Sequence, residues 1–200
     1  MWVILPVFLS QREVAVSALE LTFQLLGGKQ AAEHADELQA LHAEVYAEPP
    51  YGRDDDAGVF AGRFKVQCRQ PGFALAEARH GGYLVGYACG IPLRPSTSWW
   101  RNLTTVLPEE VTTEHQDRTF ALADLLVRAP WRRQGIAQAL HDLILAGRPE
   151  ERATLTVLPA ATPAQSAFRS WGWRKVARTR TGPGSPVCDV LLVSLPVSKP

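Results

Sequence analysis

The chain has 200 residues, of which 46% are hydrophobic and 20% charged, so its composition is that of a folded globular domain and excludes a disordered chain. The formal net charge of +1 at pH 7 argues against a polybasic protein that coats nucleic acid or membranes. Three scattered cysteines without a CxxC pair, and five histidines without an HExxH motif, argue against a disulfide framework and against a metal site.

The N-terminal stretch MWVILPVFLS is apolar, but it is too short to cross a bilayer and has neither the basic start nor the cleavage site of a signal peptide. We therefore expect a cytoplasmic protein with no membrane association. We expect residues 1–18 to be an appendage, such as an extra strand or a contact in a homodimer, and residues 19–197 to form the main domain.

The first half of this domain is predicted to contain a strand and two helices. The β-prone run from Leu19 to Gly28 is closed by two glycines. Between residues 31 and 47 the apolar positions recur in steps of three and four, which predicts one amphipathic helix that ends before two prolines. A weaker helix is expected from the acidic run 54–56, with Phe60 and Phe64 toward the core.

A hairpin is predicted over residues 72–91, because two β-prone runs flank His80-Gly81-Gly82. A long irregular stretch then extends to about Thr119. It is followed by the apolar run from Thr119 to Val127, which indicates a strand buried on both faces. The remaining predicted elements are a helix up to about residue 146, a strand over 153–159, a short helix over 163–171 and two strands over 173–178 and 187–195. This order indicates a mixed α/β domain.

The strand is followed by a motif that places positive charge and a glycine at a helix start, in the run APWRRQGIA. The first turn of a helix has amide N–H groups without intrahelical partners, so it attracts anions, and linked phosphates in particular. Gly135 permits a tight turn and a close approach of phosphate, and Ala137 is small for the same reason. Arg132 and Arg133 add charges that suit phosphate oxygens. Solvated arginines before an ordinary helix are the alternative.

The motif from Val127 to Ala137 resembles the acyl-CoA signature Arg/Gln-x-x-Gly-x-Gly/Ala of the GNAT acetyltransferase superfamily, and the predicted order of elements agrees with that family from about Leu19 to Leu195. The resemblance implies a central sheet flanked by helices and splayed between its fourth and fifth strands. It also implies that the pantetheine arm of acetyl-CoA pairs with backbone around Leu126, Val127 and Arg128. The residues implied to receive the pyrophosphate are Arg132, Arg133, Gln134, Gly135, Ile136 and Ala137.

The helix TPAQSAFRSWGW resembles the family pattern Asn-x-x-Ala-x-x-Phe-Tyr-x-x-x-Gly-Phe, but it departs from this pattern at two positions. Ala161 stands in place of the asparagine. Phe168 stands in place of the tyrosine that protonates the departing thiolate in the family. A phenylalanine cannot donate a proton, so the usual general acid is missing.

Candidates for the other roles are more weakly marked. Asp124 lies within an apolar strand, on the expected face of Phe120, Leu122 and Leu126. It is our candidate general base, because burial favours a carboxyl that accepts a proton; a structural hydrogen-bond acceptor is the alternative. Glu77 is a second candidate base, or else a surface residue of the hairpin.

Trp99 and Trp100 lie in the long loop, where they would form a substrate-binding wall or pack onto the core of the loop itself. As a lid, residues 92–119 would gain protection from hydrogen exchange when substrate binds.

The resemblance implies an acetyl-CoA-dependent N-acyltransferase that acts by direct attack of an amine, either on a small molecule or on a protein, without a metal. The alternative from another class is a non-catalytic acyl-CoA-binding sensor or scaffold. A nucleic-acid binder that uses Arg128, Arg132 and Arg133 is disfavoured by the near-zero net charge.

Overall fold

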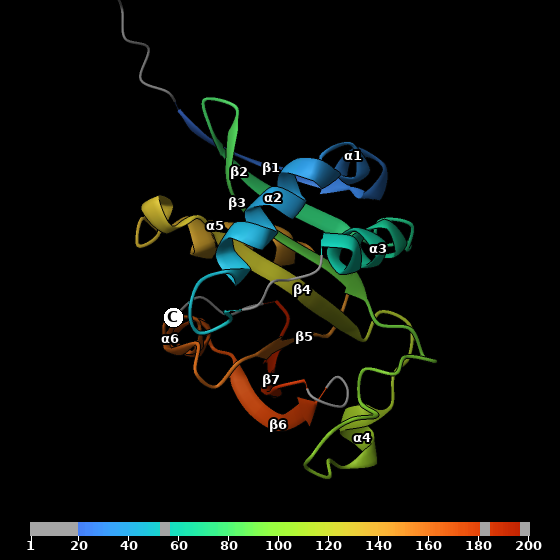
Figure 1. Cartoon of the computed structure of the whole chain (residues 1–200). Coiled ribbons are helices and arrows are strands. Elements are labelled where there is room, and N and C mark those ends of the chain that lie inside the picture. The colour runs from blue at the N-terminus through green and yellow to red at the C-terminus, as the bar shows by residue number, and fades with distance from the viewer. Residues whose placement is uncertain (1–19, 53–56, 181–184, 197–200) are drawn as a thin grey trace, which may run out of the picture.

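One seven-stranded sheet runs through the molecule in the order β1-β2-β3-β4-β5-β7-β6 (Figure 1). The computed structural model describes residues 20–52, 57–180 and 185–196, so the prediction for residues 1–18 lies outside the described residues. The strands are β1 (Leu21–Gly27), β2 (Ala74–His80), β3 (Tyr83–Pro92), β4 (Thr119–Val127), β5 (Arg152–Val157), β6 (Arg174–Arg180) and β7 (Val187–Ser194). The helices are α1 (Gly28–Glu33), α2 (Ala35–Tyr46), α3 (Ala57–Gln67), α4 (Glu109–Thr112), α5 (Ile136–Leu145) and α6 (Thr162–Ser170), with a 3-10 turn η1 (Ala129–Trp131).

The pairing between β4 and β5 is the one parallel contact of the described sheet, and it is short. Only residues 119–121 of β4 are paired with β5, and the last pair joins Ala121 to Thr154. Beyond that pair the two strands part, whereas β5 stays paired with β7 as far as Val157. This confirms the prediction of a mixed sheet that is splayed between its fourth and fifth strands.

β4 contains a bulge that changes which side chains share a face. Cys89 is paired with Asp124 and Gly90 with Leu122, so Ala123 is an extra residue with no partner of its own on β3. The expectation that Asp124 shares a face with Phe120 and Leu122 is therefore wrong. A strict alternation of side chains fails where one residue is inserted.

Two hydrophobic cores cover the opposite faces of the sheet. The α5-side core contains Phe120, Leu122 and Val127 of β4 together with Ile136, Leu140 and Ile144 of α5 and Phe168 of α6. The α2-side core contains Leu126 of β4 together with Leu38 and Leu41 of α2, Phe60 and Phe64 of α3, and Tyr87 of β3. The buried positions of Phe60 and Phe64 confirm that they face the core.

The helix predicted over residues 31–47 is in fact two helices, α1 and α2, which meet at His34. His34 has φ −100° and ψ 8°, outside the helical range, and its Nδ1 lies 2.8 Å from Oε1 of the buried Glu77 on β2. This long-range contact overrides a periodicity that was continuous in sequence.

The long irregular stretch contains only the short helix α4, and it packs along the far half of the sheet. Thr104 N donates to Arg178 O and Arg180 N donates to Asn102 O, so part of the stretch pairs with the outer edge of β6. Leu93 and Trp100 form a third core, the loop-side core, with Ala121, Ala177 and Val190.

Candidate acyl-CoA site at the divergence of two strands

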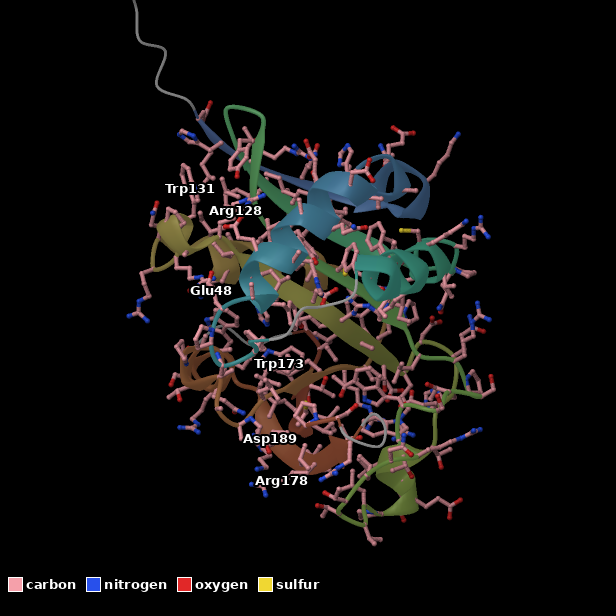
Figure 2. The ribbon with its side chains drawn as sticks, in the orientation of Figure 1. Glu48, Arg128, Trp131, Trp173, Arg178 and Asp189 are labelled. Carbon is pink, nitrogen blue, oxygen red and sulfur yellow. The ribbon has the colours of Figure 1, made fainter. Side chains whose placement is uncertain are left out.

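The link from β4 to α5 is held in place by Arg132. Its Nε donates to Val127 O across 2.8 Å, and its two terminal nitrogens pair with both carboxylate oxygens of Glu48 at 2.6 and 2.9 Å. Glu48 lies in the loop after α2, on the side of the molecule where β4 leads into α5 (Figure 2). This bidentate pair fixes the α2 loop against the end of β4.

After Arg132, the chain turns so that a row of amides is left without partners. Arg133 and Gly135 have positive φ values, of 65° and 81°, and Gly135 is the N-cap of α5. The first helical bond is from Ala139 N to Gly135 O, so no acceptor among the described residues takes the N–H groups of residues 133–138. Left-handed turns of this kind, joined to a helix start, form an anion-binding concavity. Residues 132–135 are exposed, so a ligand has access to this row.

Backbone groups of β4 also face the region where β5 has departed. Arg128 N donates to Val85 O, so the alternation of the strand turns the N–H and C=O groups of Val127 and Leu125 to the other side, toward β5. Val127 O is taken by Arg132. Of the three residues predicted to pair with pantetheine, Val127 is the one whose backbone is turned in this direction, while Leu126 and Arg128 face β3.

Arg128 has partners that draw it away from the exposed amides. Its Nε donates to Leu84 O, its NH1 is paired with Glu44, and its guanidinium lies 4.8 Å from the centre of the Tyr83 ring. Burial lowers the pKa of Arg128. Because its charge is already engaged, Arg128 ties the hairpin to α2. Arg132 is exposed but paired with Glu48, so Arg133 is the exposed arginine of the motif that has no ion pair among the described residues.

Asp124 is buried beneath α2 and α3, with only 4% of its surface exposed. Its Oδ2 accepts hydrogen bonds from Arg63 at 2.9 Å and from the Cys89 thiol at 3.5 Å. Its Oδ1 has no hydrogen-bond partner among the described residues, although His42 Nε2 lies 3.9 Å away. One carboxylate oxygen is therefore held in place by Arg63 and Cys89, while the other receives no hydrogen bond from the described residues.

Glu77 is fully buried, which corrects the alternative that it is a surface residue. It accepts hydrogen bonds from Gln24 and Arg79 at 2.9 Å each, in addition to its contact with His34. Although burial raises the pKa of Glu77, these hydrogen bonds outweigh it and bring the pKa below its usual value. A carboxylate that is kept ionised in this way is a poor general base at neutral pH, so Glu77 stabilises the start of α2 instead.

The family's usual acid position is occupied by an apolar ring. Phe168 is 7% exposed and packs edge-on against Trp171 and Trp173, with ring centres 5.5 and 5.7 Å away. Ala161, at the asparagine position, is buried at the N-terminus of α6. Neither side chain can transfer a proton, as the sequence indicates.

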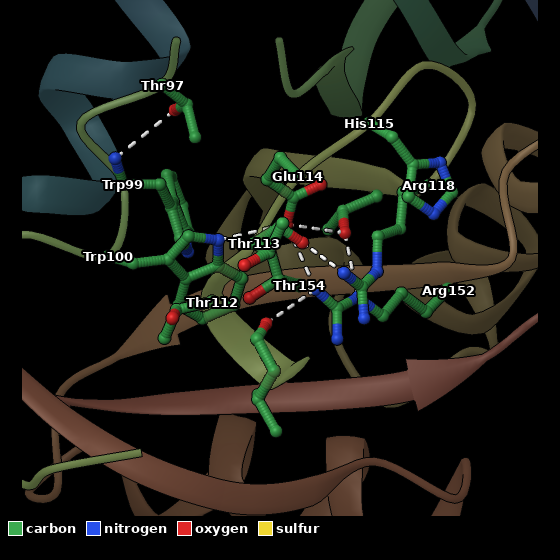
Figure 3. Close-up of polar contacts among 12 residues, drawn as sticks. Thr97, Trp99, Trp100, Thr112, Thr113, Glu114, His115, Arg118, Arg152 and Thr154 are labelled. Carbon is green, nitrogen blue, oxygen red and sulfur yellow. Dashed lines mark hydrogen bonds and ion pairs between the residues drawn. The ribbon is translucent and has the colours of Figure 1, made fainter. Parts of the chain in front are cut away.

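Trp99 and Trp100 belong to the loop-side core, which favours the interpretation that they pack onto their own loop (Figure 3). The Trp100 ring is buried, and its N–H donates to Glu114 Oε1 at 2.9 Å. Thr119 and Arg152 donate to the same oxygen, at 2.9 and 3.0 Å. The loop is thereby fastened to β4 and β5.

Sequence reasoning missed two residues at the site, Tyr51 and Asp189. Tyr51 follows Glu48 in the loop after α2 and packs against the α5-side core. Asp189 is paired in register with Val157, the last residue of β5, and is buried against Gln165, Lys175 and Arg178. Asp189 could have been found by the signal that marked Asp124, an acidic residue inside an apolar strand. Nothing in the local sequence marks Tyr51.

Two surface hollows, of about 610 and 620 Å³, lie elsewhere. The first is lined by residues such as Arg94 and Thr97, and the second by residues such as Lys29 and Phe64. Neither contains a residue of the motif. Within the described residues, no group of three or more His, Cys, Asp or Glu side chains is arranged to hold a metal ion, and no helix there has the length and apolarity needed to cross a bilayer.

Solved structures share this fold. An acetyltransferase of the GNAT family from Streptococcus pneumoniae matches with a TM-score of 0.60 and 13% identity, over 88% of this chain and 100% of that one. The ribosomal-protein-alanine N-acetyltransferase from Brucella melitensis matches with a TM-score of 0.60 and 14% identity, over 87% and 99%. Aminoglycoside 6'-acetyltransferase type Ii matches with a TM-score of 0.59 and 15% identity, over 90% and 99%. No curated protein sequence matches the chain.

At the level of sequence families, residues 33–173 match the model of the acetyltransferase (GNAT) family. The match covers more than half of the chain, and it includes α2, the splayed strands, the exposed amides and α6. The chain therefore belongs to the acetyltransferase (GNAT) family.

Proposed function

We propose that the protein is an N-acetyltransferase that moves an acetyl group from acetyl-CoA to an amine. The observation that carries this proposal is the row of six amides, residues 133–138, which have no acceptor in the described chain and begin with the exposed residues 133–135 beside the unpaired end of β4. This row fits a diphosphate, and the gap-facing backbone of Leu125 and Val127 fits the amides of the pantetheine arm. Family membership supports acetyl-CoA as the donor.

In the proposed reaction the acceptor amine attacks the thioester carbonyl directly. The amine must lose a proton, and Asp124 Oδ1 is the buried oxygen that is available to receive it. The Arg63 ion pair holds this carboxylate in one orientation. An N–H of β4 that faces β5, such as that of Leu125 or Val127, would stabilise the developing oxyanion.

The acceptor belongs to one of two classes. The matching structures include an enzyme named for a ribosomal protein alanine and one named for an aminoglycoside, so the fold serves protein and small-molecule amines alike. We propose no narrower class for this chain than a primary amine.

A non-catalytic acyl-CoA-binding module is the second candidate, and Phe168 favours it. The buried phenylalanine leaves the usual proton donor position without a hydroxyl. Such a module would bind acetyl-CoA as tightly as an enzyme does, but it would release no thiol when amines are added.

Two measurements test these functions. Isothermal titration calorimetry should detect binding of acetyl-CoA, and the variant Arg133→Glu should weaken that binding by about 10-fold or more, because a charge that favours phosphate is reversed. Arg174→Glu is the matched control, since Arg174 is equally exposed but lies on the edge strand β6. Thiol release should then occur with at least one member of a panel of small amines and peptide N-termini. Binding without thiol release on any of them would favour the non-catalytic module.

A further inference from the structure

Tyr51 lies where β4 and β5 part, because its ring connects the two cores. Tyr46, the last residue of α2, packs against the α2-side core, and Tyr51 packs against the α5-side core. Their ring centres are only 4.8 Å apart. The paired strands of the sheet lie between these two cores along most of its length. The contact between the two tyrosine rings therefore lies beyond the last pair between β4 and β5.

The backbone and the charged neighbours of Tyr51 agree with this position. Tyr51 N donates to Glu48 O across 3.0 Å, and Glu48 holds Arg132, which in turn holds Val127 O at the end of β4. Cys188 of β7 also influences the pKa of the Tyr51 phenol. Cys188 is adjacent to Asp189, which is paired with Val157, the last residue of β5. Tyr51 is thus bracketed by the ends of the two strands that part.

The hydroxyl of Tyr51 is chemically suited to donate a proton. The side chain is half-buried, and its hydroxyl makes no hydrogen bond with another described residue. Burial raises the pKa of the phenol, more than nearby Arg132 lowers it, so the group keeps its proton at neutral pH. A phenol is also the group that α6 of this chain lacks, because Phe168 stands in its place.

We infer that Tyr51 is the proton donor to the departing thiolate of CoA, taking the role for which α6 has no hydroxyl. This inference rests on the proposed acetyl transfer. In the step, the amine nitrogen forms a bond to the carbonyl carbon, the C–S bond breaks with its electron pair on sulfur, and the sulfur takes the phenolic proton. The amine's excess proton goes to Asp124, and solvent returns a proton to the Tyr51 phenolate.

The deciding experiment compares Tyr51→Phe with Tyr46→Phe, which removes a hydroxyl from the neighbouring ring. Both substitutions retain an aromatic ring, and thermal unfolding should show that both variants fold. Tyr51→Phe should lower kcat for acetyl transfer by about 100-fold, with KM for acetyl-CoA unchanged within about two-fold. Tyr46→Phe should retain kcat within about three-fold. Equal losses in both variants would overturn the inference, because they would indicate a shared structural effect of the two rings.

A second readout does not depend on transfer. The thiol of CoA bound to the protein is titrated by the ultraviolet absorbance of its thiolate. A donated hydrogen bond stabilises the thiolate, so the bound thiol should have a pKa about one unit higher in Tyr51→Phe than in the unchanged protein. This shift without any turnover would uphold the position of Tyr51 while the transferase proposal fails. An identical thiol pKa in both proteins, or no CoA binding at all, would overturn the assignment.

Discussion

The indole N–H of Trp100 donates to Oε1 of Glu114 across 2.9 Å, and this buried carboxylate also receives the Thr119 hydroxyl and the Arg152 guanidinium. Thr119 begins β4 and Arg152 begins β5, at the pair where their short parallel ladder starts. The Glu114 side chain of the loop thus fastens β4 and β5 together at the end where the two strands are paired.

Replacement of Glu114 by glutamine should therefore destabilise the fold. The change leaves the mostly buried Arg152 without its counter-charge, and the free energy of unfolding should fall by about 3 kcal/mol in urea denaturation. Glu109→Gln on the exposed helix α4 is the control and should change this free energy by less than about 0.5 kcal/mol.

Because Glu114 already fastens the loop to β4 and β5, hydrogen exchange over residues 92–119 should not slow when an acceptor binds. Marked slowing would restore the lid hypothesis.

Asp124→Asn should reduce acetyl transfer by about 100-fold while leaving the affinity for acetyl-CoA nearly unchanged. An amide retains the shape of the side chain and its contact with Arg63, but it cannot take up a proton. Rates at saturating acetyl-CoA, combined with calorimetry, separate these two effects. Asp117→Asn, on the exposed loop before β4, is a suitable control. Unchanged turnover in Asp124→Asn would remove this residue from the mechanism.

A buried histidine should make stability depend on pH. His141 Nε2 accepts the indole N–H of Trp173 at 2.9 Å, which requires that nitrogen to be unprotonated, and burial lowers the pKa of His141 below its usual value of 6.5. The unfolded chain therefore binds a proton more readily than the folded one. The contribution of His141 to stability is fully present above about pH 6.5 and is lost as the pH falls toward the lower folded-state pKa.

Denaturation measurements between about pH 7 and about pH 5 check the direction of this change in stability with pH. The unfolding free energy of the unchanged protein should decrease across this range relative to that of His141→Leu, in which the titrating group is absent. Parallel curves for the two proteins would contradict the expectation.

Phe168→Tyr should cost stability without restoring catalysis. The added hydroxyl enters a core formed with Trp171 and Trp173, and a polar group buried without a partner costs about 1–3 kcal/mol. Because Tyr51 is inferred to supply the phenol, thiol release should stay within about two-fold of the original rate. A tenfold increase in the rate of thiol release would instead indicate that a hydroxyl at position 168 reaches the departing thiolate.

Local patterns in the sequence were sufficient for most elements of the fold. The glycines at 81 and 82 have positive φ values, of 55° and 85°, and join β2 to β3 as their chemistry requires. The apolar run from Thr119 to Val127 is a strand with the predicted bounds. These features depend on neighbours in the chain, so composition and spacing suffice to predict them.

Features set by distant partners were missed. The break at His34 depends on Glu77, which lies on another element. The bulge at Ala123 depends on how β3 is paired with β4. The engagement of Arg128 with Leu84 and Tyr83 requires the folded hairpin. In the candidate site, the motif was sufficient to predict the helix start after Gly135, but the position of Tyr51 could not be predicted, because it follows from a contact between two cores.

The extra residue of β4, Ala123, affects the direction of the strand's backbone. Bulges bend a strand, and this one follows directly after the last pair between β4 and β5. A chain shortened by one residue at Ala123 would keep Asp124 and Leu125 on their present faces, and we expect its β4 to bend less beside β5. The residue at position 123 thus accompanies the departure of β4 from β5, which leaves backbone groups of β4 without a strand partner.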